Sequence, residues 1–188
     1  ELHGHIAYVG SDNNVYVFNP HIGADTALTA DANANRRYEW PTWSTDGRLA
    51  YFATTQAASG DVTVSAAVAL LDAEQPVTEV VYEGQGEVFN YASWSPGDCA
   101  DGDACRDLAI LLSGADTGMF VELVRVVGAT AANSQAIPGG PPFYYSWSPD
   151  GSRMLWHRRV ESDYQFDVYS ARTNEIETTL PYTPGGVD

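Results

Sequence analysis

The sequence is short of the residues from which most catalytic and nucleic-acid-binding sites are built. It has 9 Lys and Arg against 25 Asp and Glu, a formal net charge of −16, which disfavours binding to nucleic acid or an anionic membrane. Its four histidines are His3, His5, His21 and His157, and no serine lies in a G-x-S-x-G elbow. No run of 18 apolar residues is present, so the sequence predicts no transmembrane helix. These shortages favour a non-catalytic role.

Cysteine is also scarce, and the two that occur, Cys99 and Cys105, lie close together. This closeness predicts one local disulfide, formed in an oxidising compartment. The sequence starts at Glu1 rather than Met and shows no signal-peptide pattern, which is typical of a processed mature chain or an excised piece. We therefore expect an extracellular, cell-surface or periplasmic location.

A tryptophan-led turn recurs along the chain. Trp147-Ser148-Pro149-Asp150-Gly151 precedes the apolar run 154–156, and Trp43, with Asp46 and Gly47, precedes the similar run 49–52. A third copy starts at Trp94. Pro presets φ, Asp can bond its own backbone and Gly accepts a positive φ, so each copy predicts two strands joined by a tight turn. The tryptophans are 51 and 53 residues apart, a spacing typical of propeller blades.

The motif W-S-x-D-G followed by L-A-Y-F resembles the WD40-like (PD40) repeat of TolB-type β-propellers. Residues 14–17 and 167–170 resemble that family's third strand, and residues 27–29 and 178–180 its closing strand. Gly23 and Asn174 fall where its turn glycine stands. The resemblance implies an all-β propeller of four-stranded antiparallel blades, about 3–42, 43–93, 94–146 and 147–188, in which the motif residues build the blades rather than a site. An ordinary β-sandwich is the alternative.

The first repeat starts at its second strand, because no W-S-x-D-G motif precedes His5. Three arrangements would complete it. The tail Tyr182 to Val187 could close a four-bladed ring, the chain could belong to a longer propeller, or copies of the chain could exchange strands. TolB-type repeats mostly occur in larger rings, so the resemblance favours the second arrangement and predicts an open edge.

The third repeat carries an insertion, residues 97–107, where the other repeats have a tight turn. Asp98, Asp101 and Asp103 in this insertion predict a Ca²⁺ site that the disulfide would preorganise, and a solvated surface loop is the alternative. Two cysteines without a nearby histidine do not suit zinc. Residues 31–35 also alternate oxygen-bearing side chains, but they lack the glycine and glutamate of an EF-hand and predict a polar loop with Asx turns.

The functional expectation follows mainly from the resemblance. It implies a non-enzymatic, exported β-propeller that binds protein partners or copies of itself, with no cofactor other than Ca²⁺. One alternative is the gating propeller of a prolyl-oligopeptidase-type hydrolase whose catalytic domain lies elsewhere. Another is a carbohydrate-binding propeller that uses Trp40, Tyr144 and Tyr145, although such aromatics are more typical of a core.

Overall fold

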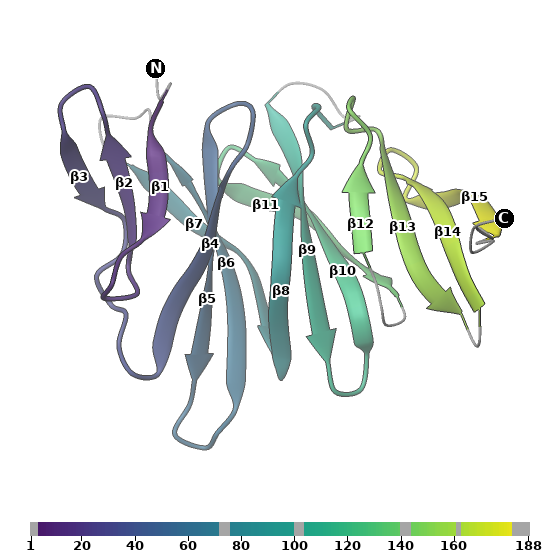
Figure 1. Cartoon of the computed structure of the whole chain (residues 1–188), viewed down its shortest axis with the longest axis horizontal. Helices are drawn as coiled ribbons and strands as arrows, with labels where there is room; N and C mark the ends of the chain where they lie inside the picture. The colour runs from purple at the N-terminus through teal and green to yellow at the C-terminus, as the bar shows by residue number, and fades with distance from the viewer. Residues whose placement is uncertain (1–3, 72–75, 100–103, 140–143, 161–162, 182–188) are drawn as a thin grey trace, which may run out of the picture.

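The chain folds into fifteen strands that form four antiparallel sheets side by side (Figure 1). The computed structural model describes residues 4–71, 76–99, 104–139, 144–160 and 163–181, and none of these residues is helical. Each sheet is made of strands that are consecutive in the sequence. The prediction of an all-β chain built from antiparallel blades is therefore confirmed.

We number the sheets as blades 1 to 4 along the chain. Blade 1 contains β1 (Ile6–Val9), β2 (Val15–Asn19) and β3 (Ala24–Ala27). The other blades have four strands each: β4 (Arg36–Trp43), β5 (Arg48–Gln56), β6 (Val62–Leu70) and β7 (Val77–Gln85) in blade 2; β8 (Glu87–Trp94), β9 (Cys105–Gly114), β10 (Gly118–Val127) and β11 (Thr130–Pro138) in blade 3; β12 (Tyr144–Trp147), β13 (Arg153–Val160), β14 (Asp163–Ser170) and β15 (Glu175–Pro181) in blade 4.

The strand that ends in each motif tryptophan belongs to the same sheet as the strands that follow it. Blades 2, 3 and 4 therefore begin at Arg36, Glu87 and Tyr144, earlier than the repeat boundaries drawn at the tryptophans. The reason is the tight turn, which folds the second strand back onto the first and joins them by hydrogen bonds. Among the described residues, blade 1 has no such first strand, and β1 pairs only with β2.

The three motif tryptophans occupy equivalent positions. Trp43 pairs with Leu49, Trp94 with Leu108 and Trp147 with Met154, so each tryptophan lies opposite the first apolar residue of the next strand. The tryptophans belong to three different sheets, which makes the alternative of one β-sandwich wrong.

The hydrophobic core lies between the blades rather than within one sheet. One cluster joins blades 1 and 2 around Val15 and Tyr51, a second joins blades 2 and 3 around Phe52 and Leu108, and a third joins blades 3 and 4 around Trp156. In β5, Leu49 and Tyr51 face blade 1 while Ala50 and Phe52 face blade 3. Both faces of a middle blade are therefore buried, which explains its long apolar runs.

The expected closing strand of blade 1 needs correction. The closing strand of blade 1 is Ala24–Ala27 rather than residues 27–29; Leu28 instead donates its backbone N–H to the carbonyl of Val15 (2.8 Å). Blades 1 and 4 lie at opposite ends of the molecule (Figure 1), so the described residues form an open arc. The tail Tyr182 to Val187 lies outside the described residues.

Candidate functional site: the turn rim and the first strands

The motif turns are held by their own serine and aspartate. In blade 2 the Ser44 hydroxyl donates to Asp46 Oδ1 (2.5 Å) and accepts the backbone N–H of Arg48 (2.8 Å). In blade 4 Ser148 donates to Asp150 Oδ1 (2.6 Å) in the same way. The serine therefore accepts a backbone N–H of the strand that follows the turn, and the aspartate holds the serine hydroxyl in place.

Both turns need glycine after the aspartate. Gly47 has a φ of 89° and Gly151 a φ of 71°, values that only glycine adopts without strain. At Asp150, hydrogen bonds from Ser148 and then from the Ser152 backbone and hydroxyl hold the pKa of the carboxyl well below its usual range. These residues stabilise turns, as the sequence predicted for them.

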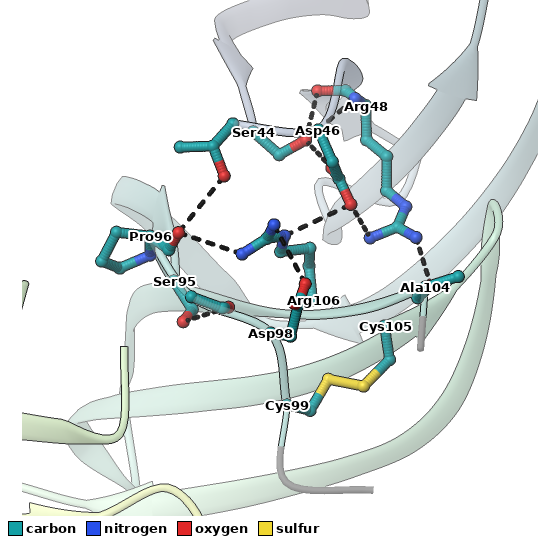
Figure 2. Close-up of polar contacts among 12 residues, drawn as sticks. Ser44, Asp46, Arg48, Ser95, Pro96, Asp98, Cys99, Ala104, Cys105 and Arg106 are labelled. Carbon is teal, nitrogen blue, oxygen red and sulfur yellow. Dashed lines mark hydrogen bonds and ion pairs between the residues drawn. A yellow bond between two sulfur atoms is a disulfide. The ribbon is translucent and has the colours of Figure 1, made fainter. Parts of the chain in front are cut away.

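Asp46 also joins two blades. Its carboxylate contacts Arg48 Nη1 (2.8 Å) in its own blade and Arg106 Nε (3.2 Å) in blade 3 (Figure 2). Burial opposes its ionisation, but the Ser44 hydroxyl and the two guanidinium groups outweigh burial and lower its pKa. Because both arginine side chains are almost completely buried, Asp46 supplies the negative charge that keeps them there.

The insertion in blade 3 packs onto this ion cluster. Cys99 and Cys105 form a disulfide, as predicted, and both are buried. The carbonyl of Ala104 accepts a hydrogen bond from Arg48 Nη2, and Asp98 Oδ1 contacts Arg106 Nη2 (3.0 Å; Figure 2). The described residues at the two ends of the insertion therefore contact the ion cluster that joins blade 3 to blade 2.

The predicted Ca²⁺ ligands are only partly described. Asp98 pairs with Arg106, while Asp101 and Asp103 lie outside the described residues. Within the described part of the chain, no three His, Cys, Asp or Glu side chains are grouped closely enough to hold a metal ion. The Ca²⁺ site stays a prediction.

The polar loop at residues 31–36 is closed by internal contacts. The backbone N–H of Asn35 donates to Asn33 Oδ1 (2.8 Å), which is an Asx turn, and Asp31 pairs with Arg36 (3.1 Å). Two shallow cavities of about 240 and 150 Å³ border Arg36 on β4. Its guanidinium already donates to the hydroxyls of Tyr38 and Thr55, so these hollows lie around an internally satisfied cation.

Aromatic side chains link the first strand of a blade to the first strand of the following blade. Three residues before each motif tryptophan stand Trp40, Tyr91 and Tyr144. Trp40 Nε1 donates to the carbonyl of Ala92 on β8 (2.8 Å). The Tyr91 hydroxyl accepts the backbone N–H of Tyr145 on β12 (3.1 Å), and the two rings stack at 5.0 Å.

These two contacts follow one rule. Ala92 and Tyr145 each stand two residues before the tryptophan of their own blade, so both contacts meet the first strand of the following blade at the same level. A third contact runs in the other direction, because Trp94 Nε1 donates to the carbonyl of Thr42 (3.0 Å). The indole nitrogens of Trp43 and Trp147 are buried and make no such bond among the described residues.

Exposure of the first-strand aromatics corrects one expectation. Tyr145 is buried in the core, but Trp40 and Tyr144 are 48% and 59% exposed. Trp40 also has a positive φ of 53° at an irregularity in the pairing of β4 with β5, a conformation that costs energy for a bulky residue. The sequence signal that relates these two residues is that each stands three residues before a motif tryptophan.

The remaining buried charges were not found by motif reasoning. Asp107 of β9 is paired with Arg125 (3.0 Å), whose Nη2 also donates to the carbonyl of Ala171 in blade 4 (3.3 Å). Glu122 on β10 is buried and accepts the hydroxyl of Ser134. Isolated charges inside apolar strands were the available signal, because such residues are buried only when they are paired.

The histidines lie apart from these charges. His157 on β13 stacks on Tyr164 (5.4 Å) and Phe166 (5.0 Å) within blade 4. His5 lies beside β1, and His3 lies outside the described residues. None of the described residues forms a helix that would cross a bilayer.

The sequence matches no known family, but solved structures with a similar fold exist. No protein-family model matches the sequence, and no curated protein matches it either. Among solved structures, the Dos1 propeller is similar, with 11% sequence identity, a TM-score of 0.55 and 95% of this chain covered. The match covers 44% of that propeller chain, so this chain spans less than half of its length. The four sheets are therefore blades of a β-propeller fold.

Proposed function

We propose that this chain is a non-catalytic, exported β-propeller segment that binds proteins through its first strands. The observation that carries the proposal is Trp40. Its indole is held by the Ala92 carbonyl, by an edge contact with Phe89 (6.3 Å) and by a tilted contact with Tyr91 (6.4 Å), and yet Trp40 is 48% exposed. A large, rigid aromatic side chain loses little entropy on binding and is typical of protein interfaces.

Other exposed residues on the first strands of blades 2 and 3 support the same role. Val88 on β8 is exposed, as are Arg37 on β4 and Asn90 on β8. Protein interfaces combine apolar and polar side chains of this kind. The disulfide between Cys99 and Cys105 supports export, because such bonds persist in oxidising compartments.

Carbohydrate binding is the second candidate, and the exposure of Trp40 and Tyr144 favours it. Exposed aromatic rings provide flat apolar surfaces on which sugar rings stack. A gating role beside a hydrolase domain would use the same propeller, and detection of a G-x-S-x-G segment in the same polypeptide would favour it.

One comparison separates these roles. The chain and its Trp40→Ala, Tyr144→Ala and Val127→Ala variants are immobilised and exposed to an extracellular protein extract and to a glycan array. We expect a protein that the wild type and Val127→Ala retain and Trp40→Ala loses at least about tenfold. Glycan binding that is lost in Trp40→Ala or Tyr144→Ala would replace the protein-binding proposal by the carbohydrate one. Equal retention by all four chains would reject both.

A further inference from the structure

The outer face of blade 1 exposes positions that every other blade buries. Ile6 and Tyr8 on β1 are 55% and 37% exposed. The L-A-Y pattern aligns Ile6 with Leu49 and Tyr8 with Tyr51. The counterparts in blades 2, 3 and 4 are at most 4% exposed, because each packs toward the preceding blade: Leu49, Leu108 and Met154 for Ile6, and Tyr51, Ile110 and Trp156 for Tyr8. The outer face of blade 1 therefore has the composition of an interface with a preceding blade.

The outer face of blade 4 shows the reverse relationship. Leu155 is 42% exposed, whereas its counterparts Ala50 and Ala109, opposite the same position of the first strand, are fully buried. Tyr144 is the counterpart of Trp40 and Tyr91, which fasten their blade to the following one. This face therefore has the composition of an interface with a following blade.

The two faces complement one another in direction. One is the side by which a blade receives its predecessor, and the other is the side by which a blade receives its successor. Exposed apolar sheet faces of this kind are rare on monomers and mark interaction surfaces. A second copy of the chain offers the missing side to both faces at once.

Each face also carries a charged side chain that already has a partner within its own blade. On blade 1, Asp25 accepts the Tyr8 hydroxyl (2.8 Å) and pairs in register with Phe18, which in turn faces Ile6. On blade 4, exposed Arg153 pairs with Glu177 (2.6 Å) and lies two residues before Leu155 on the same face of β13. Both lie at the motif-turn end, the end at which Asp46 and Arg106 already join blades 2 and 3 by an ion pair.

We infer that blade 4 of one copy packs against blade 1 of a second copy, head to tail, so that two chains form one ring. This deepens the proposed protein-binding role by naming one partner. Since this chain accounts for 44% of the similar propeller chain, two such arcs span most of a ring of that size. The edge of β1, which takes no first strand in the described residues, would offer Tyr144 the backbone groups that β8 and β12 offer Trp40 and Tyr91.

The test measures the mass of the chain in solution by native mass spectrometry and light scattering over a range of concentrations. We expect a complex of twice the 20.3 kDa chain mass. Ile6→Glu and Leu155→Glu each damage one face, and each raises the dissociation constant at least about tenfold. Val127→Glu, which changes an equally exposed valine in blade 3, leaves the constant unchanged.

Mixing the variants tests the head-to-tail arrangement. An Ile6→Glu copy retains an intact blade 4 and a Leu155→Glu copy an intact blade 1, so their mixture regains one undamaged interface and dimerises more tightly than either variant alone. Circular dichroism and urea unfolding establish that each variant is folded. If Leu155→Glu is unfolded, the exposed pair Asp25→Arg and Arg153→Asp replaces it: each weakens the dimer and the two mixed copies recover it.

A chain that stays monomeric at all concentrations would overturn the inference, as would a dimer that Ile6→Glu and Leu155→Glu leave intact. A dimer whose variants show no recovery on mixing would replace head-to-tail packing by a symmetric contact. None of these outcomes concerns the Trp40 surface, which the extract and glycan measurements test separately.

Discussion

Gly97 lies so close to the carbonyl of Asp150 that a β-carbon on Gly97 would stand 1.9 Å from that oxygen. Gly97 belongs to the insertion turn of blade 3 and Asp150 to the motif turn of blade 4. The Ser95 hydroxyl bonds the carbonyl of Gly97 (2.9 Å) beside this contact. The backbones of blades 3 and 4 therefore touch at the end of the molecule where the motif turns lie. The turn that follows Trp94 consequently needs glycine at position 97.

Replacement of this glycine should weaken the seam between blades 3 and 4. Gly97→Ala is expected to lower the free energy of unfolding by about 2 kcal/mol or more, because backbone atoms must move apart. Urea unfolding measures the loss. Gly114→Ala is the control, since the nearest atom to its new β-carbon is the Thr117 hydroxyl, which rotates away. Equal losses in the two variants would show that the close approach is unimportant.

The ion cluster at Asp46 should couple blades 2 and 3. Asp46→Asn removes the only carboxylate that contacts Arg48 among the described residues and leaves Arg106 with Asp98 alone, and we expect a loss of about 2 kcal/mol. The side chain of Asp46 is 27% exposed, so the loss should be smaller than for a fully buried pair. A double-mutant cycle with Arg106→Gln measures the coupling. A coupling near zero would mean that the two blades are held by packing alone.

The same aspartate gives stability a defined pH dependence. The pKa of Asp46 is lower in the folded chain than in the unfolded chain, so the unfolded chain binds its proton more readily. Its contribution is present above the unfolded pKa and is lost as the pH falls through the folded pKa. The difference in unfolding free energy between wild type and Asp46→Asn should therefore shrink in acid, and a difference that does not change with pH would contradict this reading.

Glu122 should act in the opposite direction. Burial, and then the charge of Glu87, raise its pKa from 4.5 to about 7. The folded chain therefore holds this proton more tightly than the unfolded chain, and stability falls as the pH rises between 4.5 and about 7. Glu122→Gln, which still accepts the Ser134 hydroxyl, should be more stable than wild type by roughly 2 kcal/mol at pH 8 and similar to it below pH 4.5.

Urea unfolding at several pH values measures this difference. The exposed Glu79→Gln on β7 is the control, because it removes the same charge without a buried site. A Glu122→Gln variant that gains no stability between acid and alkaline pH would contradict the prediction.

The disulfide should stabilise the two ends of the insertion, where Ala104 accepts a hydrogen bond from Arg48 of blade 2. Its loop is short, with a separation of six residues, so reduction is expected to cost about 2 kcal/mol. Urea unfolding with and without reductant gives the value, and a Cys99→Ser/Cys105→Ser variant should match the reduced chain.

If Ca²⁺ also binds the insertion, added Ca²⁺ will raise the unfolding temperature and a chelator will reverse the rise. An Asp98→Asn variant that keeps the same rise would place the ion elsewhere.

The turn motifs predicted the fold because their chemistry is local. Residues 148–153 contain the atoms that close this turn, so the strands on both sides follow from the sequence. The step from strands to blades depended on repetition, since Trp43 and Trp94 recur at the spacing of one four-stranded sheet.

The contacts between blades could not be predicted in the same way. Asp46 and Arg106 are 60 residues apart, and nothing local to either one indicates the other. The exposure of Trp40 was also missed, because large aromatic residues are typical of a core and only the tertiary arrangement leaves this ring open. The pairing of Asp98 with Arg106 was likewise not predicted, because the sequence only indicated other carboxylates near Asp98.

The order of the strands has a consequence for how such a molecule changes over evolutionary time. Every described strand pairs only with a strand adjacent to it in the sequence. Duplication or loss of one continuous segment of the Trp43-to-Trp94 length would therefore add or remove a complete sheet without breaking a hydrogen-bonded ladder elsewhere. The number of blades is consequently free to vary by whole units. The contact of Gly97 with Asp150 and the ion pair of Asp46 with Arg106 determine which blades fit as neighbours.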